Sequence, residues 1–128
     1  MATQTNIQKA QFIAKSGFCK PESRDCDNRV KTVLVPGSDA KSYRVIIRRF
    51  SGHVTTECQL ITSIGTINCQ GNHSHICYHS LAAIVIAVRD AGKTVHFHSS
   101  EVNARKSGGK IIPLISHQSG KIIWISIK

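Results

Sequence analysis

The sequence predicts an α+β fold in a single small domain over residues 1–128. The expected parts are an N-terminal helix, an antiparallel sheet, a central β-β-α unit and a C-terminal β-hairpin. A chain of this length can bury one modest hydrophobic core. Apolar residues recur at helical spacing in two segments and alternate with polar residues in two others. No repeat or linker divides the chain.

The N-terminal part is predicted to form a helix, a loop and a strand. In residues 5–17 apolar side chains recur at the spacing of one helical face, and Gly17 supplies a stop. Residues 18–29 are polar and contain a proline, so we expect a loop. The apolar run in residues 30–36 predicts a strand that ends at its proline.

Two alternating runs, residues 42–50 and 54–60, flank a short glycine-containing turn and predict a β-hairpin. The first run has one apolar face and one mostly basic face. In the second run Cys58 shares a face with Val54. We therefore expect the Cys58 thiol to point toward whatever packs on the sheet.

A loop over residues 62–76 and a helix from about Ser80 to Ala91 are expected next, with Gly92 at the C-terminal cap. The apolar stripe of this helix should pack against the strands. The residues expected in this core are Leu81, Ile84, Val85 and Val88 on the helix and Val45, Ile47, Val54 and Trp124 on the strands.

The C-terminal part is predicted to contain a short strand in residues 94–100 and a short helix in residues 100–109. Residues 110–116 and 121–128 then form a second hairpin. Pro113 has no backbone N–H to donate, which predicts that its strand lies at a sheet edge.

The chain is strongly basic, with 17 Lys and Arg against 7 Asp and Glu and a net charge of +10. This balance favours an anionic partner. A basic cluster of Lys41, Arg44, Arg48 and Arg49 lies at the first hairpin. Only 5% of the residues are aromatic, so few side chains can stack on single-stranded bases. We expect contact with the phosphate backbone of nucleic acid, DNA rather than RNA.

The sequence predicts no signal peptide and no transmembrane segment. Its start lacks a basic stretch followed by an apolar run, and its longest apolar run, Leu81 to Val88, has eight residues, too few to span a bilayer. We expect a cytoplasmic protein without a membrane partner. Its cysteines should be reduced, and clustered cysteines should bind metal rather than form disulfides.

The stretch NCQGNHSHICYH, residues 68–79, contains two cysteines and three histidines. A closed zinc site takes four tetrahedral nitrogen or sulfur ligands, often as close pairs. Cys77 and His79 form such a pair at the start of the predicted central helix, where the helix N-terminus favours thiolates. Cys58 and Cys69 are the expected remaining ligands.

Other interpretations remain open. His73 or His75 could replace one of the proposed ligands, although most loop histidines are only solvated. Cys19 and Cys26 could form part of a second metal site or be ordinary thiols, and free cysteines often simply fill a core.

The segments SYRVIIRRFSGHVTTECQL and ICYHSLAAIVIA together resemble a SWIM-type zinc finger. That family carries Cys-x-Cys, a variable gap and Cys-x-His on a β-β-α unit. The similarity covers about residues 42–91. By position, Cys77 and His79 match the second pair, and Cys58 matches the first cysteine.

The sequence departs from the family pattern at one ligand. Leu60 stands where the family has its second cysteine, so Cys69 would take that role, giving Cys-x10-Cys-x7-Cys-x-His. The resemblance implies zinc as the cofactor, with contacts to nucleic acid or protein and no catalysis.

The residues near the expected site also predict a protein that is not an enzyme. A catalytic zinc keeps one coordination position open and works with a general acid or base. Here four protein ligands are available, and Glu57, the nearest carboxylate in sequence, points away from Cys58 by alternation. The expected function is a non-catalytic zinc-binding protein that binds nucleic acid. The alternative is a zinc-stabilised protein-interaction adaptor.

Overall fold

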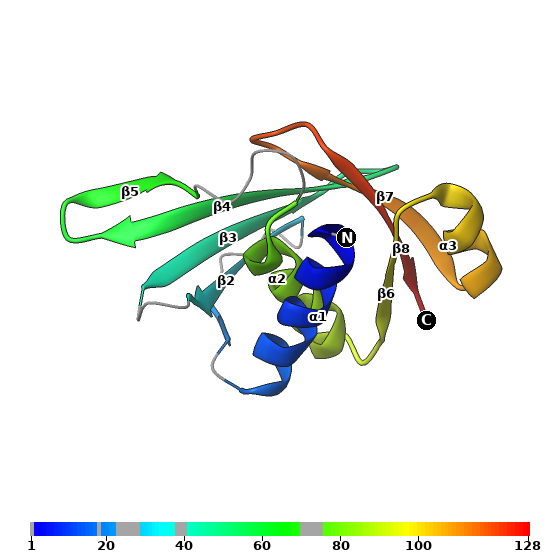
Figure 1. The fold of residues 1–128 in the computed structure, drawn as a ribbon, viewed down its shortest axis with the longest axis horizontal. Coiled ribbons are helices and arrows are strands. Elements are labelled where there is room, and N and C mark those ends of the chain that lie inside the picture. Colours follow the sequence, from blue (N-terminus) through cyan, green and yellow to red (C-terminus); the bar gives the residue numbers. More distant parts are fainter. Residues whose placement is uncertain (1, 18, 23–28, 38–40, 70–75) are drawn as a thin grey trace.

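Eight strands form a mixed sheet that curls around one central helix (Figure 1). The computed structural model describes residues 2–17, 19–22, 29–37, 41–69 and 76–128. Along the chain the elements are α1 (Ala2–Lys15), β1 (Lys20–Pro21), β2 (Val30–Pro36), β3 (Ser42–Arg49), β4 (Val54–Thr62), β5 (Gly65–Asn68), α2 (Tyr78–Asp90), β6 (Val95–His98), α3 (Glu101–Ser107), β7 (Lys110–Ser116) and β8 (Ile122–Ile127). The α+β class, the N-terminal helix, the first hairpin β3–β4 and the C-terminal hairpin β7–β8 are as predicted from the sequence.

The sheet has the strand order β1-β2-β3-β4-β7-β8-β6, and β5 pairs with β4 beside this path. The expectation of a wholly antiparallel sheet is wrong at one place, because β4 and β7 pair in parallel over three residues, Val54 to Thr56 with Leu114 to Ser116. Between these strands the chain passes through β5, α2, β6 and α3. A long crossover of this kind lets a strand return in the same direction.

The same pairing corrects the edge position expected for Pro113. Strand β7 lies inside the sheet, between β4 and β8. Its pairing with β4 begins only at Leu114, so Pro113 lies just outside the segment of β7 that has partners on both sides. Strands β1 and β5 form in segments predicted to be loops, and both are short and exposed.

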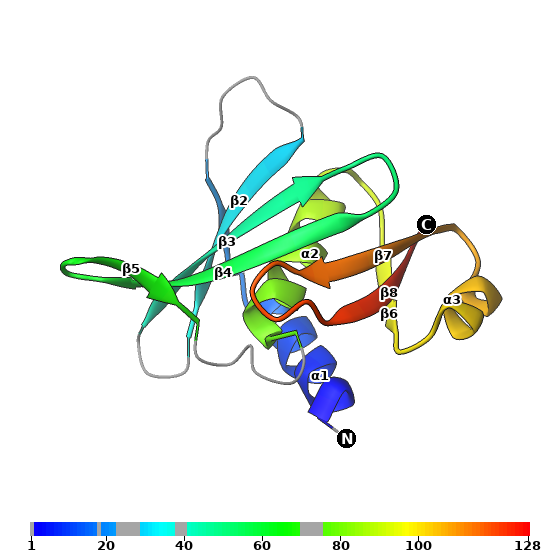
Figure 2. The same cartoon turned by 90° about the horizontal axis from the view of Figure 1, so that it is seen from above.

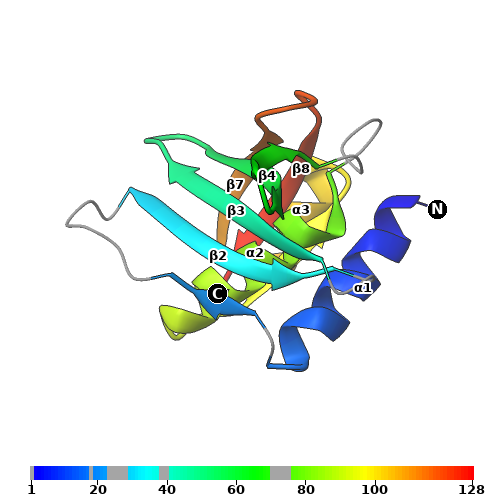
Figure 3. The ribbon, with the colours of Figure 1, turned by 90° about the vertical axis from the view of Figure 1, so that its left-hand side faces the viewer.

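Helix α2 is buried on more than the predicted stripe, because it lies between the sheet and α1 (Figure 2). Leu81 and Ile84 are buried as expected, while Val85 and Val88 are only half-buried. Ala82, Ala83 and Ile86 are also buried. A helix that is apolar around most of its circumference is typical of this central position. Figure 3 shows β2, β3 and β4 crossing over α2, with α1 alongside.

Trp124 does not occupy the core position expected for it. Ile123 and Ile125 are the buried residues of β8, and Trp124 is half-buried on the opposite face. That face is covered by α3, where the Ser126 hydroxyl donates to the Ser107 hydroxyl at 3.2 Å. Both faces of β8 therefore carry apolar side chains.

Among the described residues, no helix has the length and apolarity needed to cross a membrane.

Candidate metal centre

Four side chains that are distant in sequence meet in the core beside the N-terminus of α2. They are Cys58 on β4, Cys69 after β5, and Cys77 and His79 at the start of α2. Their ligand atoms all lie within 4.8 Å of one another, and all four residues are buried. The cluster could hold a metal ion, and its members are the four ligands expected from the sequence.

The β4–β5 hairpin brings Cys69 to Cys58. Gln59 pairs with Asn68 in the antiparallel register of this hairpin. One residue further, the Cys69 N–H donates to the Cys58 carbonyl at 3.1 Å. The ten residues between the two cysteines thus form a strand reversal, where the sequence predicts a loop from residue 62 onward. The four residues of β5 are all exposed and carry no burial pattern that would have revealed it.

The start of α2 positions the other two ligands. Cys77 is the N-cap residue, in an extended conformation, and its carbonyl accepts from the Leu81 N–H at 3.3 Å. The Asn6 side chain of α1 donates to the Ile76 carbonyl at 3.1 Å, which ties the helix entrance to α1. The Cys77 sulfur lies 3.4 Å from the Ser80 hydroxyl. This hydroxyl is placed to donate to a thiolate.

The His79 ring is fixed by two tyrosines. It stacks on Tyr43 of β3 with centroids 3.7 Å apart, and it lies tilted beside Tyr78 at 4.1 Å. Its Nδ1 is 3.6 Å from the Cys69 sulfur. Its Nε2 is buried without a hydrogen-bond partner among the described residues. Nδ1 is thus the nitrogen that lies beside a thiol, and a ring held among thiols fits a metal ligand better than a core filler.

Crowding of three sulfur atoms opposes ionisation in the absence of a cation. Hydrogen bonding to Cys69 and Cys77, together with burial, strongly raises the pKa of Cys58. For Cys77, hydrogen bonding to Cys58 lowers the pKa, but hydrogen bonding to Cys69 and burial outweigh it and raise the pKa to about 11. A bound divalent cation inverts this balance, because it stabilises the thiolates directly.

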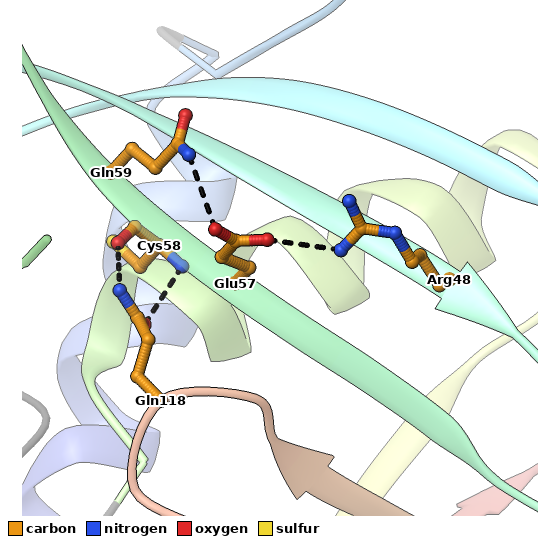
Figure 4. Close-up of polar contacts among 5 residues, drawn as sticks. All are labelled: Arg48, Glu57, Cys58, Gln59 and Gln118. Atoms are coloured by element: carbon orange, nitrogen blue, oxygen red, sulfur yellow. Dashed lines mark hydrogen bonds and ion pairs between the residues drawn. The ribbon is translucent and has the colours of Figure 1, made fainter. Parts of the chain in front are cut away.

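The donor set is three sulfurs and one imidazole nitrogen, which fits a closed tetrahedral site. No carboxylate of a described residue belongs to the cluster. Glu57 points to the opposite face of β4, where it accepts from Arg48 and Gln59 (Figure 4). Cys19 lies apart from the cluster, with its sulfur 3.9 Å from the Ile13 carbonyl. His73, His75 and Cys26 lie outside the described residues.

Gln118, in the β7–β8 turn, holds the backbone of Cys58 (Figure 4). Its side-chain carbonyl accepts from the Cys58 N–H at 3.1 Å, and its amide donates to the Cys58 carbonyl at 2.6 Å. The pairing of β4 with β7 ends at Thr56. The Gln118 amide therefore extends the hydrogen bonding of β4 to Cys58, two residues beyond Thr56. Nothing in the sequence pattern indicates this role.

The basic residues predicted to contact phosphate lie away from the metal cluster. Arg44 and Arg48 are on the face of β3 opposite the buried Val45 and Ile47. Each is paired with a carboxylate: Arg44 with Glu22 at 2.9 Å and Arg48 with Glu57 at 3.0 Å.

The remaining two cations of the predicted cluster, Lys41 and Arg49, are exposed. At the β3–β4 turn, Phe50 and His53 stack with centroids 4.7 Å apart and an interplanar angle of 13°. Both rings line a hollow together with Arg29, Arg48 and Arg49. Neither Phe50 nor His53 is among the residues predicted from the sequence to contact phosphate.

No protein-family model, curated protein or solved structure matches this chain. The geometry of the site therefore carries the functional argument.

Replacing Gln118 with Ala should lower the unfolding free energy of the metal-loaded protein by about 1–3 kcal/mol, because the Cys58 N–H loses its acceptor and the Cys58 carbonyl keeps only the Cys69 N–H as donor. Gln118→Glu should cost at least as much, since a carboxylate oxygen would then face the Cys58 carbonyl. The measurement is denaturant unfolding. Gln59→Ala, on the outer face of β4, is the control. Equal stability of Gln118→Ala and Gln59→Ala would contradict this role.

Metal affinity should fall steeply as pH falls. In the metal-free protein the raised pKa values keep Cys58 and Cys77 protonated at pH 7, so binding must displace these protons. Between pH 7 and 8 the logarithm of the apparent affinity should rise by about two to three per pH unit, one for each thiol proton displaced. Competition with a chelator at both pH values measures it. A change of one or less would contradict binding by these thiols.

Proposed function

We propose that this chain is a non-catalytic zinc-binding protein in which the metal fixes the junction of the β3–β4 hairpin, β5 and α2. The observation that carries the proposal is the buried cluster of three cysteines and one histidine. Four protein donors fill a tetrahedral site and leave no position for a substrate or water.

Zinc is favoured by the chemistry of the donors. Thiolates are soft ligands that select zinc, copper(I) or iron–sulfur clusters, and a Cys₃His set is a usual one for structural zinc. The SWIM-type resemblance supports the same ion. A hairpin carrying Cys58 precedes a helix that opens with Cys77 and His79, which is the order that family implies. Cys69 then supplies the ligand for which the family pattern has a cysteine at Leu60.

The partner we propose is nucleic acid, with DNA ahead of RNA, bound through Lys41, Arg44, Arg48 and Arg49. The net charge of +10 supports an anionic partner. The arginines around the β3–β4 turn, next to the exposed ring of Phe50, offer charge and a small stacking surface together.

A protein-interaction adaptor is the second candidate, and one observation favours it. Glu22 and Glu57 occupy the same sheet face as the arginines with which they pair. These carboxylates offset part of the positive charge and would repel phosphate. A face of mixed charge suits a protein partner as well as a nucleic acid.

Cys77→Ser should lose zinc and most of the folding stability, because metal binding and folding are coupled. Cys19→Ser should keep both, since Cys19 lies outside the cluster. Metal analysis and thermal unfolding of the purified variants measure this. Equal zinc content in the two variants would refute the assignment. If Cys69→Ser keeps zinc while Cys77→Ser loses it, the fourth ligand would be His73 or His75 instead of Cys69.

If the arginine face binds phosphate, removing its carboxylates should strengthen binding. The double variant Glu22→Gln, Glu57→Gln should bind random duplex DNA more tightly and steepen the slope of log affinity against log salt by up to about two, roughly 0.9 for each phosphate gained. Glu101→Gln, which removes a carboxylate paired with Arg105 on α3, is the control.

A salt titration of DNA binding makes the comparison. Unchanged affinity in the double variant would contradict phosphate contact at this face. Binding of wild-type protein to duplex DNA and single-stranded RNA weaker than about 100 μM at physiological salt would favour the adaptor.

A further inference from the structure

An apolar hollow lies where the two halves of the curled sheet meet over the C-terminal half of α2. Its volume is about 180 Å³. Its floor is aliphatic and is formed by Ile47, Val54, Ile84, Ala87, Val88, Ala91, Ile112, Ile125 and Ile127. Ile47, Val54, Ile84 and Ile125 are themselves buried, so the hollow reaches the hydrophobic core.

Among the described residues, every charged side chain at the rim of this hollow is cationic. Five basic residues line it: Arg29, Lys31, Arg49, Lys93 and Lys110. They come from β2 and the residue before it, the end of β3, the segment after α2 and the start of β7. No carboxylate lines the hollow within the described part of the chain. All five side chains are exposed, so an anion at the mouth can reach them.

The chemistry of the floor indicates which kind of anion the hollow would bind. In the part of the chain that the structure describes, no aromatic ring and no polar side chain belongs to the floor. A nucleobase placed there would lose hydrogen bonds to water and gain none, which is unfavourable. A hydrocarbon chain has no such groups and gains from contact with the floor.

We propose that this hollow binds a free medium-chain carboxylate, with its aliphatic tail on the floor and its carboxylate at the cationic rim. An apolar cavity of about 150 Å³ holds one benzene ring. A volume of 180 Å³ therefore fits a tail of about six to eight carbons. The hollow is separate from the metal cluster, and the proposal rests neither on zinc nor on nucleic-acid binding.

Octanoate is the probe, and the purified full chain is titrated while the methyl signals of Ile84 and Ile125 are followed by NMR. Octanoate should shift these signals saturably and bind at least about fivefold more tightly than octanol, which has the tail without the charge. Acetate, which has the charge without the tail, should not shift them.

Two variants separate the rim from the floor. Lys93→Gln combined with Lys110→Gln should weaken octanoate binding about three- to tenfold, whereas Lys121→Gln, in the β7–β8 turn, should not change it. Val88→Phe should fill the hollow and abolish binding. Val102→Phe, at an exposed position of α3, is its control. Backbone NMR spectra verify that each variant is folded.

Three results would overturn the proposal. Equal affinity for octanoate and octanol would show that the rim does not take part. Octanoate binding that survives Val88→Phe in the folded variant would place the ligand elsewhere. Shifts of the Ile84 and Ile125 signals by a single-stranded oligonucleotide or by anionic phospholipid vesicles, with none by octanoate, would assign the cations to phosphate or to a lipid surface instead.

Discussion

The rest of the structure depends on one constraint. Three sulfurs and an imidazole meet inside the core, with their ligand atoms within 4.8 Å of one another. The four residues join β4, the chain after β5 and the first turn of α2. Without a cation, buried thiols crowd one another and resist ionisation, as the raised pKa values of Cys58 and Cys77 show. With a cation, the same crowding becomes a coordination sphere. In a chain of 128 residues, such a link can contribute a large share of the stability.

Much of this site is predictable from the sequence because its ligands follow local patterns. Strict alternation in β4 places Cys58 inward, and the Cys-x-His pair coincides with a helix start. The rest depends on contacts between distant segments. Exposed β5 carries no apolar periodicity, so the reversal that delivers Cys69 is invisible. Gln118 reaches Cys58 across 60 residues. The prediction that Trp124 lies in the core is wrong because α3 covers the outer face of β8. Both faces of that strand are therefore apolar, and alternation does not show which face points to the core.

The charged surface shows the same division between local and long-range information. Alternation in β3 correctly puts Arg44 and Arg48 on one face. Their partners come from other elements: Glu57 lies on β4, and Glu22 directly follows β1. Only the fold reveals the two ion pairs. Meanwhile Lys31, Lys93 and Lys110, unremarkable in sequence, gather with Arg49 around an apolar hollow. Net charge predicts an anionic partner, whereas its distribution over the fold determines which anion each surface suits.

We propose that Cys58, Cys69, Cys77 and His79 hold one zinc ion. X-ray absorption spectroscopy at the zinc edge of the purified protein tests it directly, because it reports the number and type of atoms bound to the metal. We expect one zinc per chain with about three sulfurs near 2.3 Å and one nitrogen near 2.0–2.1 Å. A first shell of nitrogen and oxygen alone, or a folded protein purified without bound metal, would contradict the account.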